Sequence, residues 1–115
     1  MRLTSGAALL TLLVGPCSAA CDFVEMLADD ARLTRAVKGL EAGTPEDQVL
    51  KRLGQPHDSG TEFHLAQEED FEAEYDAAAK SSSVRYLFWQ GDFEVVCAVG
   101  FDRHKRLSYR ACGGT

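Results

Sequence analysis

Three segments in the C-terminal third of the chain alternate apolar and polar positions with the period of a β-strand. The segments are residues 84–90, 93–101 and 106–112. Turn-forming residues separate them at 91–92 and 102–105. In the last segment Leu107, Tyr109 and Ala111 would share one face. The pattern predicts a three-stranded antiparallel meander with one apolar face.

An amphipathic helix is predicted over residues 22–41, with Asp22 as its N-cap. Its apolar residues recur at spacings near three and four: Phe23, Leu27, Leu33, Val37 and Leu40. The pattern weakens at Asp29 and Asp30, so we expect the first part of this helix to act as a flexible tether.

A second, shorter helix is predicted within residues 43–56 (GTPEDQVLKRLGQP). Thr44 is placed to cap its first turn, Pro45 suits the first helical position, and Asp47 would complete a capping box. The Gly-Gln-Pro sequence at 54–56 ends it. One face carries Val49, Leu50 and Leu53. A helix of about ten residues does not persist alone in water, so it must pack on the sheet.

These elements predict a single α+β domain over residues 21–115. Two N-terminal helices would cover the apolar face of the three-stranded meander, in the order α-α-β-β-β.

Residues 58–83 form an acidic insert between the helices and the strands, with eight acidic residues and one lysine. Charge runs mostly mark solvated surface, which favours a solvated excursion with a short strand at 61–65 and a helical turn at 71–79. The alternative is an acidic recognition loop.

The N-terminal segment has the features of an export signal. Arg2 precedes the apolar run at 7–14, and small residues lead to a cleavage point before Cys21. Residues 1–20 are therefore predicted to be a signal peptide, and the run is too short for a mature transmembrane helix. Removal of Arg2 with this segment leaves 11 basic and 18 acidic side chains, a net charge of −7. Such a charge disfavours nucleic acid and electrostatic adhesion to anionic lipid.

Three cysteines would remain after cleavage, in an oxidising compartment. Lipid modification of Cys21 would leave Cys97 and Cys112 as one disulfide pair; ordinary cleavage at the same bond would leave Cys21 as an unmodified N-terminus. Matching the apolar faces sets Cys97 opposite Ala111, so the disulfide requires a bulge or a twist at the strand end.

The sequence shows no recognisable catalytic motif, so we expect neither an enzyme nor a cofactor. His57, His64 and His104 lack the spacing of metal ligands, which favours exposed histidines over a metal site.

Aromatic residues on the first strand are the candidate contact site for a protein partner. Tyr86 and Phe88 share one side of the strand, and Leu87 and Trp89 share the other. One pair would lie in the core. The other pair would be exposed to a partner or covered by the acidic insert.

The short helix and its surroundings resemble the SmpA/OmlA (BamE-like) family of small outer-membrane lipoproteins. The matching residues are Gly43-Thr44, Val49, Leu53-Gly54-Gln55-Pro56, Tyr86 and Trp89. The family pattern G-x-[ST]-x-x-x-V-x-x-x-L-G-x-P differs here by one residue before the valine. One repeat of the β-lactamase inhibitor proteins has a similar unit.

The resemblance implies a non-enzymatic lipoprotein of the bacterial cell envelope that faces the periplasm from the outer membrane. It would act as a scaffold or binding module for an envelope protein, in outer-membrane assembly or envelope integrity. Asp22 also resembles the inner-membrane retention signal of enteric bacteria, so the choice of membrane stays open. The alternative function is a secreted inhibitor-like or ligand-binding module.

Overall fold

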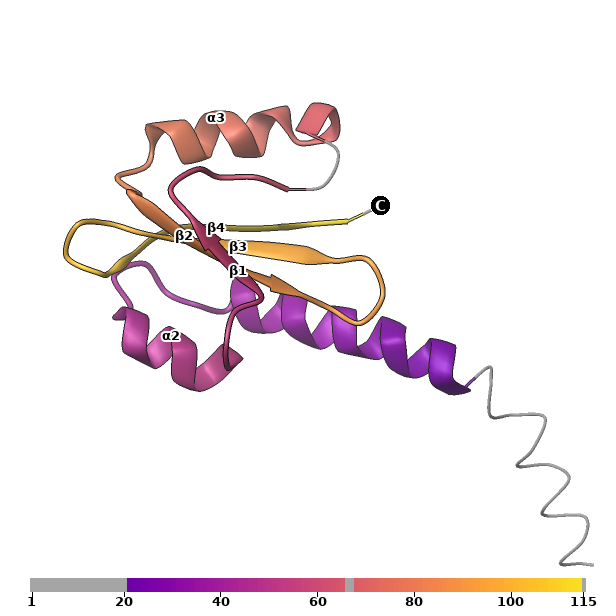
Figure 1. The fold of residues 1–115 in the computed structure, drawn as a ribbon. Coiled ribbons are helices and arrows are strands. Elements are labelled where there is room, and N and C mark those ends of the chain that lie inside the picture. Colours follow the sequence, from indigo (N-terminus) through magenta and orange to yellow (C-terminus); the bar gives the residue numbers. More distant parts are fainter. Residues whose placement is uncertain (1–20, 66–67, 115) are drawn as a thin grey trace, which may run out of the picture.

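The computed structural model describes residues 21–65 and 68–114 of the chain. The predicted signal peptide, residues 1–20, lies outside the described residues. Within them the chain has an α+β fold in which helices cover both faces of an antiparallel sheet (Figure 1). The predicted fold class is therefore confirmed.

The elements are more numerous than the sequence pattern predicted. A helix occupies the described residues 21–38 and is called the N-terminal helix below. The elements that follow are α2 (Glu46–Leu53), β1 (Asp58–Gly60), the 3-10 helix η1 (Glu68–Asp70), α3 (Glu72–Lys80), β2 (Arg85–Gln90), β3 (Val96–Phe101) and β4 (Leu107–Gly113). The predicted order of two helices and three strands omits β1 and α3, which both come from the insert; α3 corresponds to the helical turn that we expected at 71–79.

The sheet has the order β1-β2-β3-β4, and each strand is antiparallel to its neighbour. The predicted meander corresponds to β2, β3 and β4. At the outer side of β2, β1 adds a short edge strand, with Ser59 paired to Leu87. The insert thus begins as part of the sheet, a few residues before the strand that we expected at 61–65.

The N-terminal helix and α2 cover one side of the sheet, which we call the helix face (Figure 1). Its buried side chains are Val37, Leu40, Val49, Leu87, Trp89, Cys97, Val99, Phe101 and Leu107. Trp89 also donates from Nε1 to the carbonyl oxygen of Gly54 at 3.1 Å, which links the end of α2 to β2. The predicted packing of the short helix on the sheet is therefore confirmed.

The insert covers the opposite side, which we call the insert face. Its buried side chains are Leu65, Ala78, Tyr86, Phe88 and Ala98, with Phe63, Phe71, Tyr75, Tyr109 and Ala111 packed partly buried around them. The hydroxyl of Tyr75 accepts from the N–H of Leu65 at 2.9 Å and lies 3.2 Å from its carbonyl oxygen. The insert is thus a packed third layer, because its aromatic side chains find an apolar surface on the sheet.

A β-bulge explains why the predicted single apolar face is wrong for β4. Leu107 pairs with Phe101, but Tyr109 pairs with Gly100, so Ser108 is skipped in the register. The bulge sends Leu107 to the helix face and both Tyr109 and Ala111 to the insert face.

The same bulge brings the last two cysteines together. One extra residue in β4 shifts the register so that Cys97 pairs with Cys112 instead of Ala111. The two form a disulfide with an S–S distance of 2.03 Å. Both the predicted bond and the bulge that it required are confirmed.

The start of α2 is fixed by the β3–β4 turn and not by the predicted capping box. The N-cap residue Pro45 makes no side-chain cap, and the hydroxyl of Thr44 donates to the carbonyl oxygen of Glu41 at 2.6 Å instead of accepting from the first turn. The N–H of Glu46 donates to the carbonyl oxygen of Lys105 at 2.9 Å, and that of Leu107 donates to Thr44 at 2.9 Å. Tertiary backbone hydrogen bonds therefore replace the local cap.

Two aspartates of the N-terminal helix hold the β2–β3 loop. Asp30 accepts hydrogen bonds from the consecutive N–H groups of Phe93, Glu94 and Val95 at 3.0, 2.8 and 3.3 Å. Asp29 accepts a hydrogen bond from the N–H of Asp92, the residue before Phe93, at 3.0 Å. Desolvation raises the pKa of Asp30, but the three N–H donors outweigh it and lower that pKa below its ordinary value. The expected tether at this point is wrong: the residues that interrupt the apolar pattern fasten the helix to the sheet.

Candidate functional site

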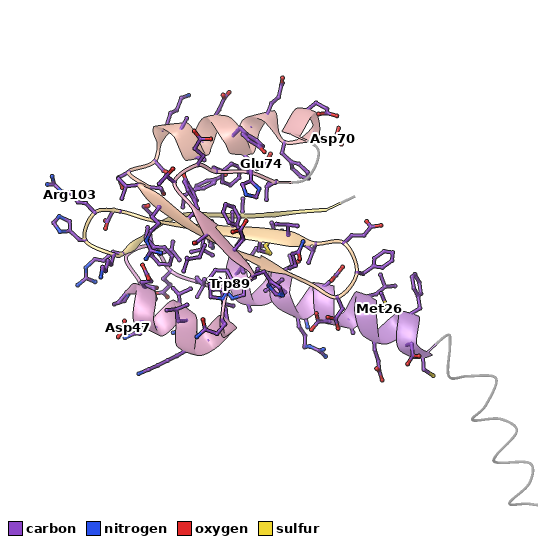
Figure 2. All side chains as sticks on the ribbon, viewed as in Figure 1. Met26, Asp47, Asp70, Glu74, Trp89 and Arg103 are labelled. Atoms are coloured by element: carbon purple, nitrogen blue, oxygen red, sulfur yellow. A yellow bond between two sulfur atoms is a disulfide. The ribbon has the colours of Figure 1, made fainter. Side chains whose placement is uncertain are left out.

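The three aromatic residues predicted to contact a partner are all buried. Tyr86, Phe88 and Trp89 are 4, 2 and 2 % exposed. Tyr86 and Phe88 point to the insert face and Trp89 to the helix face, as the alternation predicted. Figure 2 shows Trp89 between the sheet and α2. Tyr86 and Phe88 are covered by the acidic insert and are not exposed to a partner, which was the other alternative. They reach the surface only at hollows that the insert leaves open.

Two such hollows meet at His64, and we call them together the insert hollows. The first has a volume of about 540 Å³ and is lined by the rings of Phe63, Tyr75 and Tyr86, with Glu62 beside them. The ring centre of Phe63 lies 4.9 Å from that of Tyr75 and 5.7 Å from that of Tyr86, both edge to face. Aromatic walls next to a carboxylate suit a flat or cationic group of a binding partner.

The second hollow, of about 420 Å³, lies beside the edge strand β1 and is lined by His57, Asp58 and Phe88 among others. His64 stacks on Phe88 with ring centres 4.1 Å apart and so forms the wall between the two hollows. His57 accepts the N–H of Gln90 through Nδ1 at 3.1 Å, which assigns its hydrogen to Nε2.

Negative charge surrounds the insert hollows. Glu69, Glu72 and Asp76 line a further depression next to Tyr75 on the outside of the insert. Burial, with Glu74 and Tyr86 nearby, raises the pKa of Tyr109, so its hydroxyl stays protonated and neutral at physiological pH. The site thus offers anionic rims and aromatic walls, which favour cationic or aromatic groups over anions.

The histidines and cysteines are distributed as follows. His57, His64 and His104 are all exposed, which confirms that expectation, and only the first two share a hollow. Within residues 21–65 and 68–114 no cluster of three or more His, Cys, Asp or Glu side chains could hold a metal ion. Cys21 is exposed in the N-terminal helix, at the first residue that the structure describes.

No family model, no curated protein and no solved structure matches the chain. The resemblance to the SmpA/OmlA family therefore stays a prediction from the short-helix motif. None of the helices in the described part of the chain combines the length and the apolar character needed to cross a membrane.

The sequence reasoning missed Phe63, His64 and Tyr75 as residues of the site. A signal was present, because the acidic insert carries aromatic residues at 63, 71 and 75. The last two are four residues apart, the spacing that puts side chains on one face of a helix. Aromatic residues at helical spacing inside a charged run indicate a packed amphipathic element.

Proposed function

We propose that this protein is a non-enzymatic, lipid-anchored module of the bacterial cell envelope that binds an envelope protein through the insert hollows. The observation that carries the proposal is that the predicted lipidation site and the insert hollows lie on different sides of the sheet. Cys21 lies in the N-terminal helix, which covers the helix face, whereas the insert hollows open at the other face of the sheet. Figure 1 shows the N-terminal helix and α3 on opposite sides of the sheet. An anchor at one side leaves the hollows accessible at the other.

The chemistry of the hollows supports a protein partner. Their walls combine phenyl, phenol and imidazole rings with the carboxylates of Glu62 and Asp58. Aromatic side chains and arginine dominate the binding energy of protein interfaces, and an arginine side chain would meet both a ring face and a carboxylate here. The resemblance to the SmpA/OmlA lipoproteins supports the same role in the outer membrane.

The anchor is tested by growing cells with labelled palmitate. We expect incorporation into the full-length protein and its loss in Cys21→Ala, because acylation at this thiol requires the side chain. The matched control is the Cys97→Ala/Cys112→Ala double variant, which removes two cysteines but keeps Cys21 and should stay labelled. Label that persists in Cys21→Ala, or no label at all, contradicts the lipoprotein.

The binding surface is tested by a photo-crosslinking amino acid placed at Glu62 in intact cells. We expect one envelope protein to be crosslinked, and the crosslink to be lost when His64→Ala removes the wall between the hollows. Lys51, exposed on α2, is the control position and should give no such product. Equal products from both positions, or none from Glu62, contradict a partner at the insert hollows.

The size of the first hollow favours the second candidate function, a released ligand-binding module. Its volume of about 540 Å³ falls in the range of small-molecule sites. This candidate predicts that the protein appears in the soluble fraction without palmitate, so the labelling experiment separates the two.

A further inference from the structure

Exposed apolar side chains gather at one end of the molecule. In the described residues the large hydrophobic side chains with the greatest exposure are Phe23, Val24, Leu27, Val84 and Phe93. All but Val84 lie near the start of the N-terminal helix or in the β2–β3 loop beside it. We call Phe23, Val24, Leu27 and Phe93 the anchor-end patch; they are 49, 61, 41 and 42 % exposed.

The patch is assembled by the fold and is not a frayed terminus. The rings of Phe23 and Phe93 meet edge to face with their centres 5.3 Å apart, although 70 positions separate them in the sequence. The hydrogen bonds that Asp29 and Asp30 accept from the β2–β3 loop hold Phe93 in this position. Two elements therefore join to present apolar rings to the outside instead of to the core.

The place of the patch indicates what covers it. Phe23 and Val24 lie two and three residues after Cys21, the proposed attachment site of the lipid. We propose that the anchor-end patch rests in the boundary between the headgroups and the acyl chains of the membrane to which Cys21 attaches the protein. The inference rests on the proposed function and adds a second, non-covalent membrane contact to it.

The charges around the patch decide which force holds it there. Asp22 and Glu25 are exposed beside it, so anionic headgroups repel this end of the protein. Attraction must therefore come from the burial of apolar area, with the phenyl rings at the depth where aromatic side chains collect in membranes. The acyl anchor keeps the patch at a high effective concentration near the bilayer, so a weak intrinsic affinity is sufficient.

A second contact would fix the orientation of the domain. One acyl chain alone leaves the protein free to rotate about its attachment, whereas the patch would bring the N-terminal end of the first helix against the bilayer. Figure 2 shows Met26 at this end, with Arg103 at the far end of the sheet and Glu74 in the layer of α3. The insert hollows would then be directed away from the lipid surface.

The test places tryptophan reporters in the full-length protein, reconstituted in phosphatidylcholine vesicles with or without bromine on the acyl chains. Phe93→Trp puts an indole in the patch, and Phe23→Trp is a second reporter from the other element. Val84→Trp is the matched control, because Val84 is 55 % exposed at the opposite end of β2. Native Trp89 is buried and serves as the background.

We expect brominated lipid to remove most of the emission added by Phe93→Trp and Phe23→Trp, and to leave Val84→Trp and the wild type unchanged. Emission that is unquenched in both patch reporters, or quenched equally in Val84→Trp, overturns the inference. Palmitate labelling gives the separate answer on the anchor. Labelled protein without quenching contradicts the patch alone, whereas quenching without label contradicts the lipoprotein alone.

Discussion

The two faces of the sheet are both apolar, but they are built from different side chains and sealed to different degrees. On the helix face most buried residues are aliphatic, and seven of the nine are at most 2 % exposed: Val37, Leu40, Val49, Trp89, Cys97, Val99 and Phe101. On the insert face aromatic rings predominate, and half of the cluster is only partly buried. One face is a closed core, and the other is an aromatic layer with openings.

The difference follows from how each cover is attached. α2 is tied to the strands by the indole of Trp89, by an ion pair between Arg85 and Glu46, and by backbone bonds to the β3–β4 turn. The N-terminal helix is tied by Asp29 and Asp30, and by Arg110, which donates to the carbonyl oxygen of Lys38. The insert pairs with β2 through β1, and the rest of it is held by side chains: ring contacts, the paired hydrogen bonds of Tyr75 and a hydrogen bond between the hydroxyls of Ser83 and Ser108. The hollows lie on the face whose cover is held mainly by side chains.

The largest effect is expected from Trp89→Ala. Trp89 is buried on the helix face and holds the end of α2, so truncation should lower the free energy of unfolding by about 3–5 kcal/mol. Urea denaturation followed by circular dichroism measures it. A partner-contact role for Trp89 instead predicts an unchanged stability.

Phe88→Ala is the matched variant, because Phe88 is the neighbouring residue, equally buried, on the other face. We expect a smaller global loss, with faster amide hydrogen exchange confined to the insert. Equal losses from both variants would mean that the two faces unfold as one unit, and the comparison drawn above would fail.

The second prediction concerns the disulfide on the helix face. The Cys97→Ala/Cys112→Ala double variant should lose about 3 kcal/mol, because the bond closes a loop of 15 residues in the unfolded chain. Thermal unfolding with and without reductant measures the loss. Reductant should destabilise the wild type and leave the variant unchanged; a wild type insensitive to reductant contradicts the prediction.

The helix face could be predicted from the sequence and the insert face could not, for physical reasons. The apolar stripe of α2 and the alternating apolar residues of β2 and β3 indicate directly which side chains meet on the helix face. The bulge at Ser108 has no such signal: it was required only by the cysteine pairing, and it moves Tyr109 to the other face. The capping box failed because tertiary bonds to Lys105 and Leu107 took its place.

The candidate site was not predicted from the sequence because the many acidic residues of the insert are typical of solvated surface. The acidic residues of the insert indicate solvated surface, yet Glu69, Glu72 and Asp76 are exposed on a layer whose inner side carries Phe71 and Tyr75. The acids at Asp29 and Asp30 misled in the same way, because their role is to accept backbone hydrogen bonds from a loop 63 or more positions away. Polar residues that satisfy distant backbone groups leave no local pattern.

A smaller effect is expected from Tyr75→Phe on the insert face. The change removes the hydroxyl that bonds both backbone groups of Leu65, which should cost about 1 kcal/mol of local stability. Hydrogen exchange at the Leu65 amide should accelerate, while the Trp89 indole N–H on the helix face keeps its protection. If the indole also loses protection, the insert is as firmly coupled to the core as the helices are.

The smallest effect is the pH dependence contributed by Asp30. Its pKa in the folded protein lies below that of the unfolded chain, because three backbone N–H groups stabilise the carboxylate. A lowered pKa contributes stability that is fully present above the unfolded value, near pH 3.9, and is lost as the pH falls through the folded value. Urea unfolding of the wild type and of Asp30→Asn should therefore differ at neutral pH, and the difference should shrink on acidification below about pH 4.

Asp47→Asn, which removes an exposed carboxylate from α2, is the control for net charge. Its difference from the wild type should stay small at every pH. If Asp30→Asn behaves in the same way, the bonds to the β2–β3 loop do not fasten the helix face. In that case the anchor-end patch also loses its support, since the same bonds hold Phe93 against Phe23.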